Sequence, residues 1–243
     1  HQLDFSTNTH TYKDLRPDSA YYHTWFDHRF NALDSVYSKQ IGTRFDNQFL
    51  LKTTIGNLQH PLELQAGIGV RIDQLSNDLN NAADKTSIYS NYLVAHLDRT
   101  AIHPNELEVH AYAQFIATGS ASGNHTIQLQ VAKKISNQLG NIQIGLHETQ
   151  SIAAFQFTNF SSNYYSFTKD LNATLHNQLY VKWKLDKLHF GIEARQHVLS
   201  NYIYINAQQL VSQSDQTIAI TQFIISKNFV FRNIINTNEL LIS

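Results

Sequence analysis

Apolar and polar residues alternate along residues 62–75, which read LELQAGIGVRIDQL. The apolar parity consists of Leu62, Leu64, Ala66, Ile68, Val70 and Ile72. The other parity consists of Glu63, Gln65, Gly67, Gly69, Arg71 and Asp73. Successive side chains of a β-strand point to opposite faces of its sheet, so this segment predicts a strand with one apolar face and one polar face.

The same alternation recurs in three later segments. Residues 106–117 alternate Leu107, Val109, Ala111, Ala113 and Phe115 with Glu106, Glu108, His110, Tyr112 and Gln114. Residues 171–185 alternate Leu171, Ala173, Leu175, Leu179, Val181, Trp183 and Leu185 with Asn172, Thr174, His176, Gln178, Tyr180, Lys182 and Lys184. Residues 188–198 alternate Leu188, Phe190, Ile192, Ala194 and Val198 with His189, Glu193, Arg195 and His197. These runs exceed the roughly five or six residues of an average globular strand.

Helical periodicity is weak throughout, so we expect an all-β chain of about eleven strands. The expected strands are residues 2–12, 48–55, 62–75, 87–97, 106–117, 125–135, 142–157, 171–185, 188–205, 217–225 and 229–240.

The connections between these strands sort by length. Alternate connections are the short GNLQHP, DRTAIHPN, SNQLGN, DK and SKN. The connections between them are the longer SNDLNNAADKT, TNFSSNYYSFTKD and NAQQLVSQSDQ and the intermediate TGSASGN. Alternate connections of an up-and-down meander lie at opposite ends, so one end has short turns and the other long loops, as in transmembrane β-barrels. A Greek-key sandwich gives no reason for such sorting.

Two environments could cover the apolar faces, a protein core or lipid. Mean hydropathy is −0.33, and no run approaches the ~20 apolar residues of a membrane helix. This excludes a helical membrane protein but fits a β-barrel, whose strands average to near-neutral hydropathy. The long strands, the sorted loops and the scarcity of turn residues (9 Gly and 3 Pro) favour lipid.

Aromatic residues stand where interfacial girdles of a barrel would lie. Trp183 and Phe190 flank the short connection at 186–187, and Tyr164, Tyr165 and Phe167 precede the opposite end of the same strand. Ordinary β-propensity of aromatic residues is the alternative explanation.

Bulk composition excludes several functions. The net charge is −1, so there is no basic footprint for nucleic acid. Cysteine is absent, which removes disulfides, thiol catalysis and thiolate metal sites. Methionine is also absent, so we expect a processed chain or a fragment.

The stretch from residue 12 to residue 51 carries a family resemblance. It reads YKDLRPDSAYYHTWFDHRFNALDSVYSKQIGTRFDNQFLL, with DLRP, YY, LDS and RFDN elements between two strands. A later stretch, GIEARQHVLSNYIYINAQQLVSQSDQTIAITQFIISKNFVF, has an Asn-Tyr-x-Tyr step, a Gln/Ser-rich loop and a strand that leads to Lys-Asn-Phe. Both resemble the "putative porin" family of Bacteroidetes-type outer membranes.

This resemblance implies an integral outer-membrane β-barrel that conducts small solutes, or a channel-like subunit of a surface complex. Family members begin with a signal peptide and further strands and end in an aromatic-rich strand, so we expect this chain to be truncated at both ends. We therefore predict one antiparallel up-and-down transmembrane β-barrel domain over residues 1–243, incomplete in this chain, with a long external loop at 13–47.

No sequence motif predicts a metal, a cofactor or a catalytic group. There is no HExxH spacing, and His189 and His197 lie about 26 Å apart along one strand. Neither Asp27-His28 nor His147 with Ser151 forms a convincing triad for a barrel hydrolase.

We predict that the polar parity lines a water-filled lumen with nearly balanced charge and no strong ion selectivity. The lumen-lining residues would be Glu63, Gln65, Arg71, Asp73, Glu106, Glu108, His110, Tyr112, His176, Lys182, Lys184, His189, Glu193 and Arg195. The lipid-facing residues would be Leu62, Leu64, Ile68, Val70, Ile72, Leu107, Val109, Phe115, Leu175, Leu179, Val181, Trp183, Phe190 and Ile192.

The predicted partners are outer-membrane lipid, small solutes and other surface proteins, with no nucleic acid. Two alternatives stay open: an exported soluble β-sandwich that binds carbohydrate or protein through its long loops, and an outer-membrane barrel hydrolase.

Overall fold

The computed structural model describes residues 1–18, 35–56, 61–77, 84–101, 103, 106–136, 138–162, 166–207, 210–231 and 234–242. Eleven strands form one sheet whose order follows the chain, with every neighbouring pair antiparallel. They are β1 (Gln2–Asp14), β2 (Val36–Ile55), β3 (Leu62–Asn77), β4 (Asp84–Arg99), β5 (Leu107–Gly119), β6 (His125–Ser136), β7 (Gly140–Ser151), β10 (Thr174–Leu185), β11 (Phe190–Ser200), β14 (Ile218–Phe231) and β15 (Ile234–Ile242). The predicted up-and-down, all-β architecture is confirmed.

The smaller elements lie in the connections. The β7–β10 connection contains the one-turn helix α2 (Phe155–Thr158) and the hairpin of β8 (Asn159–Ser161) with β9 (Ser166–Thr168). The β11–β14 connection contains the hairpin of β12 (Ile203–Ile205) with β13 (Val211–Gln213). We call the end of the sheet that carries these hairpins the loop end. The opposite end, where the short 3₁₀ turn η1 (Asp186–Leu188) joins β10 to β11, is the turn end.

Among the residues that the structure describes, no helix is long and apolar enough to cross a bilayer.

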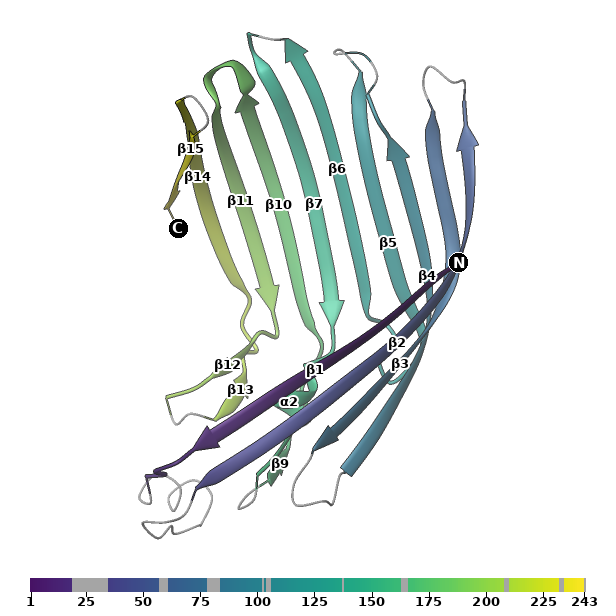
Figure 1. Cartoon of the computed structure of the whole chain (residues 1–243), viewed down its shortest axis with the longest axis vertical. Helices are drawn as coiled ribbons and strands as arrows, with labels where there is room; N and C mark the ends of the chain where they lie inside the picture. The colour runs from purple at the N-terminus through teal and green to yellow at the C-terminus, as the bar shows by residue number, and fades with distance from the viewer. Residues whose placement is uncertain are drawn as a thin grey trace.

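The sheet is strongly curved and open (Figure 1). Strands β1 to β3 cross in front of the wall formed by the later strands, and the described residues show no pairing between β1 and β15. The polar parity occupies the concave face, because Gln40 of β2 donates a hydrogen bond across the hollow to the Asn159 carbonyl, 2.8 Å away. Residues so distant in strand order meet only across the inside of the curve.

Burial on the two faces is the reverse of that in a soluble protein. On the convex face, large apolar side chains are exposed: Phe5 by 71%, Ile68 by 63% and Leu93 by 53%. On the concave face, polar side chains are sheltered, with Ser90 3% and Glu193 7% exposed, and Tyr92 packs beside them with Val94, Ile116 and Ala121. Contiguous apolar patches of this extent are rare on soluble monomers and mark a surface that contacts a membrane or another protein.

Two glycines on the concave face make room for tyrosine rings. Gly69 lies directly opposite Tyr92, and Gly145 lies directly opposite Tyr180. A Cβ at either glycine would overlap the ring of its partner. Each ring therefore lies flat over its glycine, an arrangement that pins the register of paired strands. The space above Gly69 is filled by the Tyr92 ring.

Two predicted strands end earlier than expected. The strand expected at 142–157 stops at Ser151, because both neighbouring ladders end there, at the pairs Ser151–Thr174 and Gln150–His125. The strand expected at 188–205 stops at Ser200, where Asn201 adopts a left-handed conformation with φ of 55°.

Two predicted connections were placed wrongly. The expected turn SKN lies inside β14, because Lys227 pairs with Phe190 and the Asn228 amide donates to the His189 carbonyl at 2.9 Å. The expected external loop at 13–47 is shorter, because β1 extends to Asp14 and β2 begins at Val36, where each pairs with the other. The centre of that loop, residues 19–34, lies outside the described residues.

The Gly69–Tyr92 contact generates a first prediction. Gly69→Ala should displace the Tyr92 ring and lower the free energy of unfolding by about 1–3 kcal/mol, the usual cost of overpacking. Gly42→Ala on the same face is the control, because the nearest atom to its added methyl is Leu75 Cδ2 at 3.3 Å. Urea unfolding of the refolded protein in detergent measures both. Equal stability of the two variants would contradict the proposed packing.

Candidate functional site

Polar side chains of successive strands form continuous rows across the concave face, since directly opposed residues of paired strands share a face. A central row runs through His110, Gln130, Gly145, Tyr180, Arg195 and Gln222. Tyr180 ties this row together, because its hydroxyl donates to Gln130 Oε1 at 3.2 Å and accepts from Gln143 Nε2 at 2.8 Å. The concave face is thus a hydrogen-bonded polar surface and is the candidate functional site.

Ion pairs neutralise the charges on β2 and β3. Arg71 Nε contacts Asp46 Oδ2 at 2.8 Å, and the Tyr92 hydroxyl donates to the other oxygen of this carboxylate. The Arg71 guanidinium also lies over the Tyr92 ring, 5.2 Å from its centre. One row closer to the loop end, Arg44 makes a two-bond contact with Asp73 at 2.6 and 3.3 Å. The cation lies on β3 in the first pair and on β2 in the second, so each strand carries one charge of each sign. The two pairs therefore leave little net charge at this level of the sheet.

A second charged group lies on β10 and β11. Glu193 is 7% exposed and accepts a hydrogen bond from Arg195, two residues along the same strand. Lys182, directly opposite on β10, lies 3.4 Å from the other carboxylate oxygen. Two cations thus share the Glu193 carboxylate, and Glu239 of β15 lies beside the same group, so the charges here are also balanced.

Histidines form two further clusters on the concave face. His176 Nε2 and His197 Nδ1 are 3.0 Å apart with stacked rings, and the His147 ring lies 6.4 Å from that of His176. His110 bridges two acids, with Asp98 and Glu108 each 2.8 Å from a ring nitrogen. Within the described ranges, no group of three or more His, Cys, Asp or Glu side chains is placed to hold a metal ion.

The β7–β10 connection folds inward across the loop end of this face. Besides the Gln40–Asn159 hydrogen bond, Phe160 makes an edge contact with the Tyr12 ring at 6.4 Å and stacks on Phe167 at 5.5 Å. Its other side is held by Asn172, which exchanges hydrogen bonds of 2.8 and 2.9 Å with Gln213 of the β11–β14 connection. The connection therefore bridges distant strands and narrows the hollow. We call residues 152–162 and 166–173 the crossing segment.

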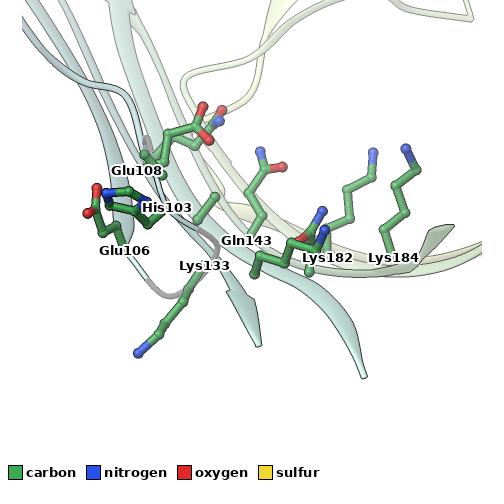
Figure 2. A pocket seen from close by; sticks show the side chains of 12 residues that line it. His103, Glu106, Glu108, Lys133, Gln143, Lys182 and Lys184 are labelled. Atoms are coloured by element: carbon green, nitrogen blue, oxygen red, sulfur yellow. The ribbon is translucent and has the colours of Figure 1, made fainter. Parts of the chain in front are cut away.

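Two cavities flank the ion-paired middle of the face. The cavity at the loop end has about 840 Å³ and lies between strands β1 to β5 and the crossing segment. The cavity at the turn end has about 490 Å³ and is lined by charged and amide side chains from β5, β6, β7 and β10 (Figure 2). Figure 2 shows Glu108 on one side of this second cavity and Lys182 and Lys184 on the other.

Most predicted site residues lie on the expected face. The concave face carries Glu63, Gln65, Arg71, Asp73, Glu108, His110, Tyr112, His176, Lys182, Lys184, Glu193 and Arg195. The convex face carries Leu62, Leu64, Ile68, Val70, Ile72, Leu107, Val109, Phe115, Leu175, Leu179, Val181, Trp183, Phe190 and Ile192. Their exposure to lumen or lipid stays a prediction.

A few predicted positions differ. His189 lies in the turn after η1, with φ of 48°, and not in a strand, and Glu106 lies at a bend before β5 beside the turn-end cavity. Phe167 belongs to the crossing segment and not to an outer girdle, and Tyr164 and Tyr165 lie outside the described residues. At the turn end Trp183 does contact Phe190, and its indole donates to the Leu139 carbonyl at 2.7 Å.

Sequence reasoning missed the partners of several of these residues. Asp46 falls within the predicted loop at 13–47, so its pairing with Arg71 was not foreseen. Gln40 was missed for the same reason, although its parity relative to Arg44 was a usable signal. Tyr92 lies on the polar parity of β4 beside Gly69, and the glycine in an alternating strand was the available clue.

The half-buried Asp46 pair and an exposed pair on the same strands allow a matched comparison. Asp46→Asn should lower the free energy of unfolding by about 1–3 kcal/mol, because the carboxylate accepts charge-assisted hydrogen bonds in a site sheltered from water. Lys52→Gln breaks the Lys52–Glu63 pair, whose side chains are 53% and 40% exposed, and should cost less than about 1 kcal/mol. Urea titration of both variants in detergent tests this order, and a reversed order would refute it.

Comparison with known proteins identifies the family to which the chain belongs. None of the curated proteins searched matches it. A family model described as "Putative porin", however, matches residues 1–241, almost the whole chain. The match agrees with the long antiparallel meander and its polar concave face, and the chain belongs to this porin family.

Proposed function

We propose that this protein forms a passive diffusion pathway for small solutes through the outer membrane of a Gram-negative envelope. The convex face would contact lipid, and the concave face would line an aqueous lumen. The observation that carries the proposal is the reversed burial, with Ile68 and Leu93 exposed on one face while Glu193 and Arg71 are sheltered on the other. Family membership supports a porin-like outer-membrane β-structure.

The energetics favour this orientation. Apolar surface that leaves water gains about 25 cal/mol per Å², so each exposed Leu, Ile or Phe of the convex face contributes favourably in hydrocarbon. Lipid also provides no hydrogen-bond partners, so the backbone must pair internally, as the ladders of β2 to β14 do on both sides.

Charged residues on the convex face lie near the strand ends. Lys133 is close to the turn end of β6, whereas His125 begins β6 at the loop end and pairs with Glu148 at 2.9 Å. Such positions match the polar headgroup levels of a bilayer, where charges cost ~0–1 kcal/mol instead of ~2–4 at the midplane.

The crossing segment would set the size limit of the pathway. It lies over the concave face, and it contacts β1 and β2 through Phe160 and Asn159. Solutes would pass between it and the sheet through the loop-end cavity, then along the ion-paired middle to the turn-end cavity. The nearly balanced net charge of −1 supports weak overall ion selectivity.

Other roles have less support. The described strands form one meander, so the soluble sandwich alternative does not describe this fold. We infer a non-enzymatic role from the porin family in place of a barrel hydrolase. A channel-like subunit of a surface complex would have the same barrel but would work together with other outer-membrane proteins. Conductance of the protein by itself would distinguish an independent channel from such a subunit.

The orientation of the sheet can be tested by placing one arginine on either face. Ile68→Arg should destabilise the bilayer-inserted protein by about 2–4 kcal/mol, because it carries a charge into hydrocarbon near the middle of β3. Gln65→Arg puts the same residue on the opposite face of the same strand and should change stability by less than about 1 kcal/mol. Folding into phosphatidylcholine vesicles, followed by urea titration, measures both. Equal costs would refute the lipid-facing assignment.

The channel itself is tested by conductance. The complete gene product, reconstituted in planar bilayers, should conduct KCl, and vesicles that contain it should swell in small sugars. Gln40→Ala removes the hydrogen bond to Asn159, worth about 0.5–1.5 kcal/mol, and should raise permeability to larger sugars about two- to tenfold. Gln65→Ala, far from the crossing segment, is the control. A protein without conductance would refute the diffusion pathway, and identical sugar permeability of the two variants would refute the size limit.

A further inference from the structure

The turn-end cavity has an acidic wall and a basic wall at the same height of the sheet. One row of directly opposed residues runs from Glu108 on β5 through Ala132 and Gln143 to Lys182 on β10. Strands lie about 4.8 Å apart, so the two charged residues are about 14 Å apart at the backbone and are brought closer by the curvature. Ala132 and Gln143 line the cavity between them, and neither carries a charge. Figure 2 shows Gln143 between Glu108 and Lys182.

The basic wall is reinforced by the next row towards the turn end. Lys134 on β6 and Lys184 on β10 lie on either side of Asn141, and both line the cavity. Lys184 has a partner, Asp186 at 3.1 Å, on the turn beyond it. The Lys134 ammonium forms no ion pair or hydrogen bond with any other residue that the structure describes. Its charge is therefore available to a solute.

The acidic wall contains more than one carboxylate. Glu108 lies beside His110, which also contacts Asp98, and Glu106 lines the same cavity at the bend before β5. The two walls therefore differ in sign although the chain as a whole is nearly neutral. A field directed across the cavity pulls the positive and negative groups of a solute towards opposite walls and so orients a solute that carries both.

A zwitterion is the ligand whose chemistry matches this pattern. Its carboxylate is attracted by Lys134, and also by Lys182 and Lys184, which contact Glu193 and Asp186 as well. Its ammonium is attracted by Glu106 and Glu108, so neither wall repels the solute. A simple anion gains at one wall and loses at the other, and a simple cation does the reverse. At about 3.5 Å per residue, a chain of one to three amino acids fits a cavity of about 490 Å³.

We propose that the turn-end cavity is a binding subsite for small zwitterionic solutes of the amino acid or short peptide class. This deepens the proposed diffusion pathway and rests on it, because the subsite would select which solutes cross. The subsite orients the solute across the cavity, with its carboxylate at β6 and β10 and its ammonium at β5.

Binding can be measured without transport. The complete protein in detergent micelles is mixed with glycylglycine, N-acetylglycine or glycinamide, which carry both charges, the negative charge or the positive charge. Saturation-transfer NMR should report the strongest binding for glycylglycine. Raising the salt from 0.1 to 1 M should weaken it, since the screening length falls from ~10 to ~3 Å.

Adjacent lysines on β6 supply the matched variants. Lys134→Gln should weaken glycylglycine binding about two- to fivefold, the scale of one partly exposed charge contact. Lys133→Gln makes the same change one residue away. Lys133 contributes to the cavity lining, but its side chain points away from Glu108 and Lys182 in Figure 2, so this variant should leave binding unchanged. Glu108→Gln should weaken binding of glycylglycine and glycinamide but not of N-acetylglycine.

The outcomes separate this subsite from the diffusion pathway. Conductance together with equal binding of the three probes, or equal effects of Lys134→Gln and Lys133→Gln, would overturn the zwitterion subsite and leave the pathway intact. Selective binding of glycylglycine without conductance would support the subsite and refute the pathway. Stronger binding of N-acetylglycine than of glycylglycine would overturn the zwitterion subsite and identify the cavity as an anion site.

Discussion

The register of the antiparallel ladders is the constraint on which the rest of this structure depends. Side chains alternate between faces, so a slip of one residue in β3 would turn Arg71 and Asp73 to the convex face and bring Ile68 and Val70 inside. It would also separate Arg71 from Asp46 and move Tyr92 off Gly69. Ion pairs and ring contacts on the concave face thus select the same register that keeps the apolar side chains together on the convex face.

The same constraint explains where the chain leaves the sheet. β7 ends at Ser151 because β6 and β10 offer no further partners, and the freed segment turns inward to meet Gln40 and Tyr12. Buried backbone N–H and C=O groups need hydrogen-bond partners. In the crossing segment, the pairing of β8 with β9 supplies some of them. The shape of the hollow is therefore set by ladder lengths as much as by side chains.

Sequence alone was sufficient for the repeating part of this fold. The period of two, sustained along residues 62–75 and 171–185, identified the strands, their order and the face of each alternating residue. The sequence pattern was insufficient where pairing with a neighbouring strand decides whether a segment belongs to the sheet. Nothing local distinguishes residues 152–157 from a continuing strand, and Lys227 and Asn228 resemble a turn until β11 is seen to pair with them. Cross-strand partners such as Asp46 require a register that a single strand does not reveal.

The distribution of charge along the concave face follows from these pairings. In the middle, Arg44 and Arg71 are paired with Asp73 and Asp46, so little uncompensated field is left there. At the turn end the acids lie on or beside β5 and the lysines on β6 and β10, with one to three strand spacings between the two groups. Lys182 and Lys184 have acidic partners on their own side of the cavity, whereas the charges of the two walls face each other without pairing and leave a field across it. In the proposed pathway, a face with balanced total charge would therefore discriminate solutes at the turn end and not in its middle.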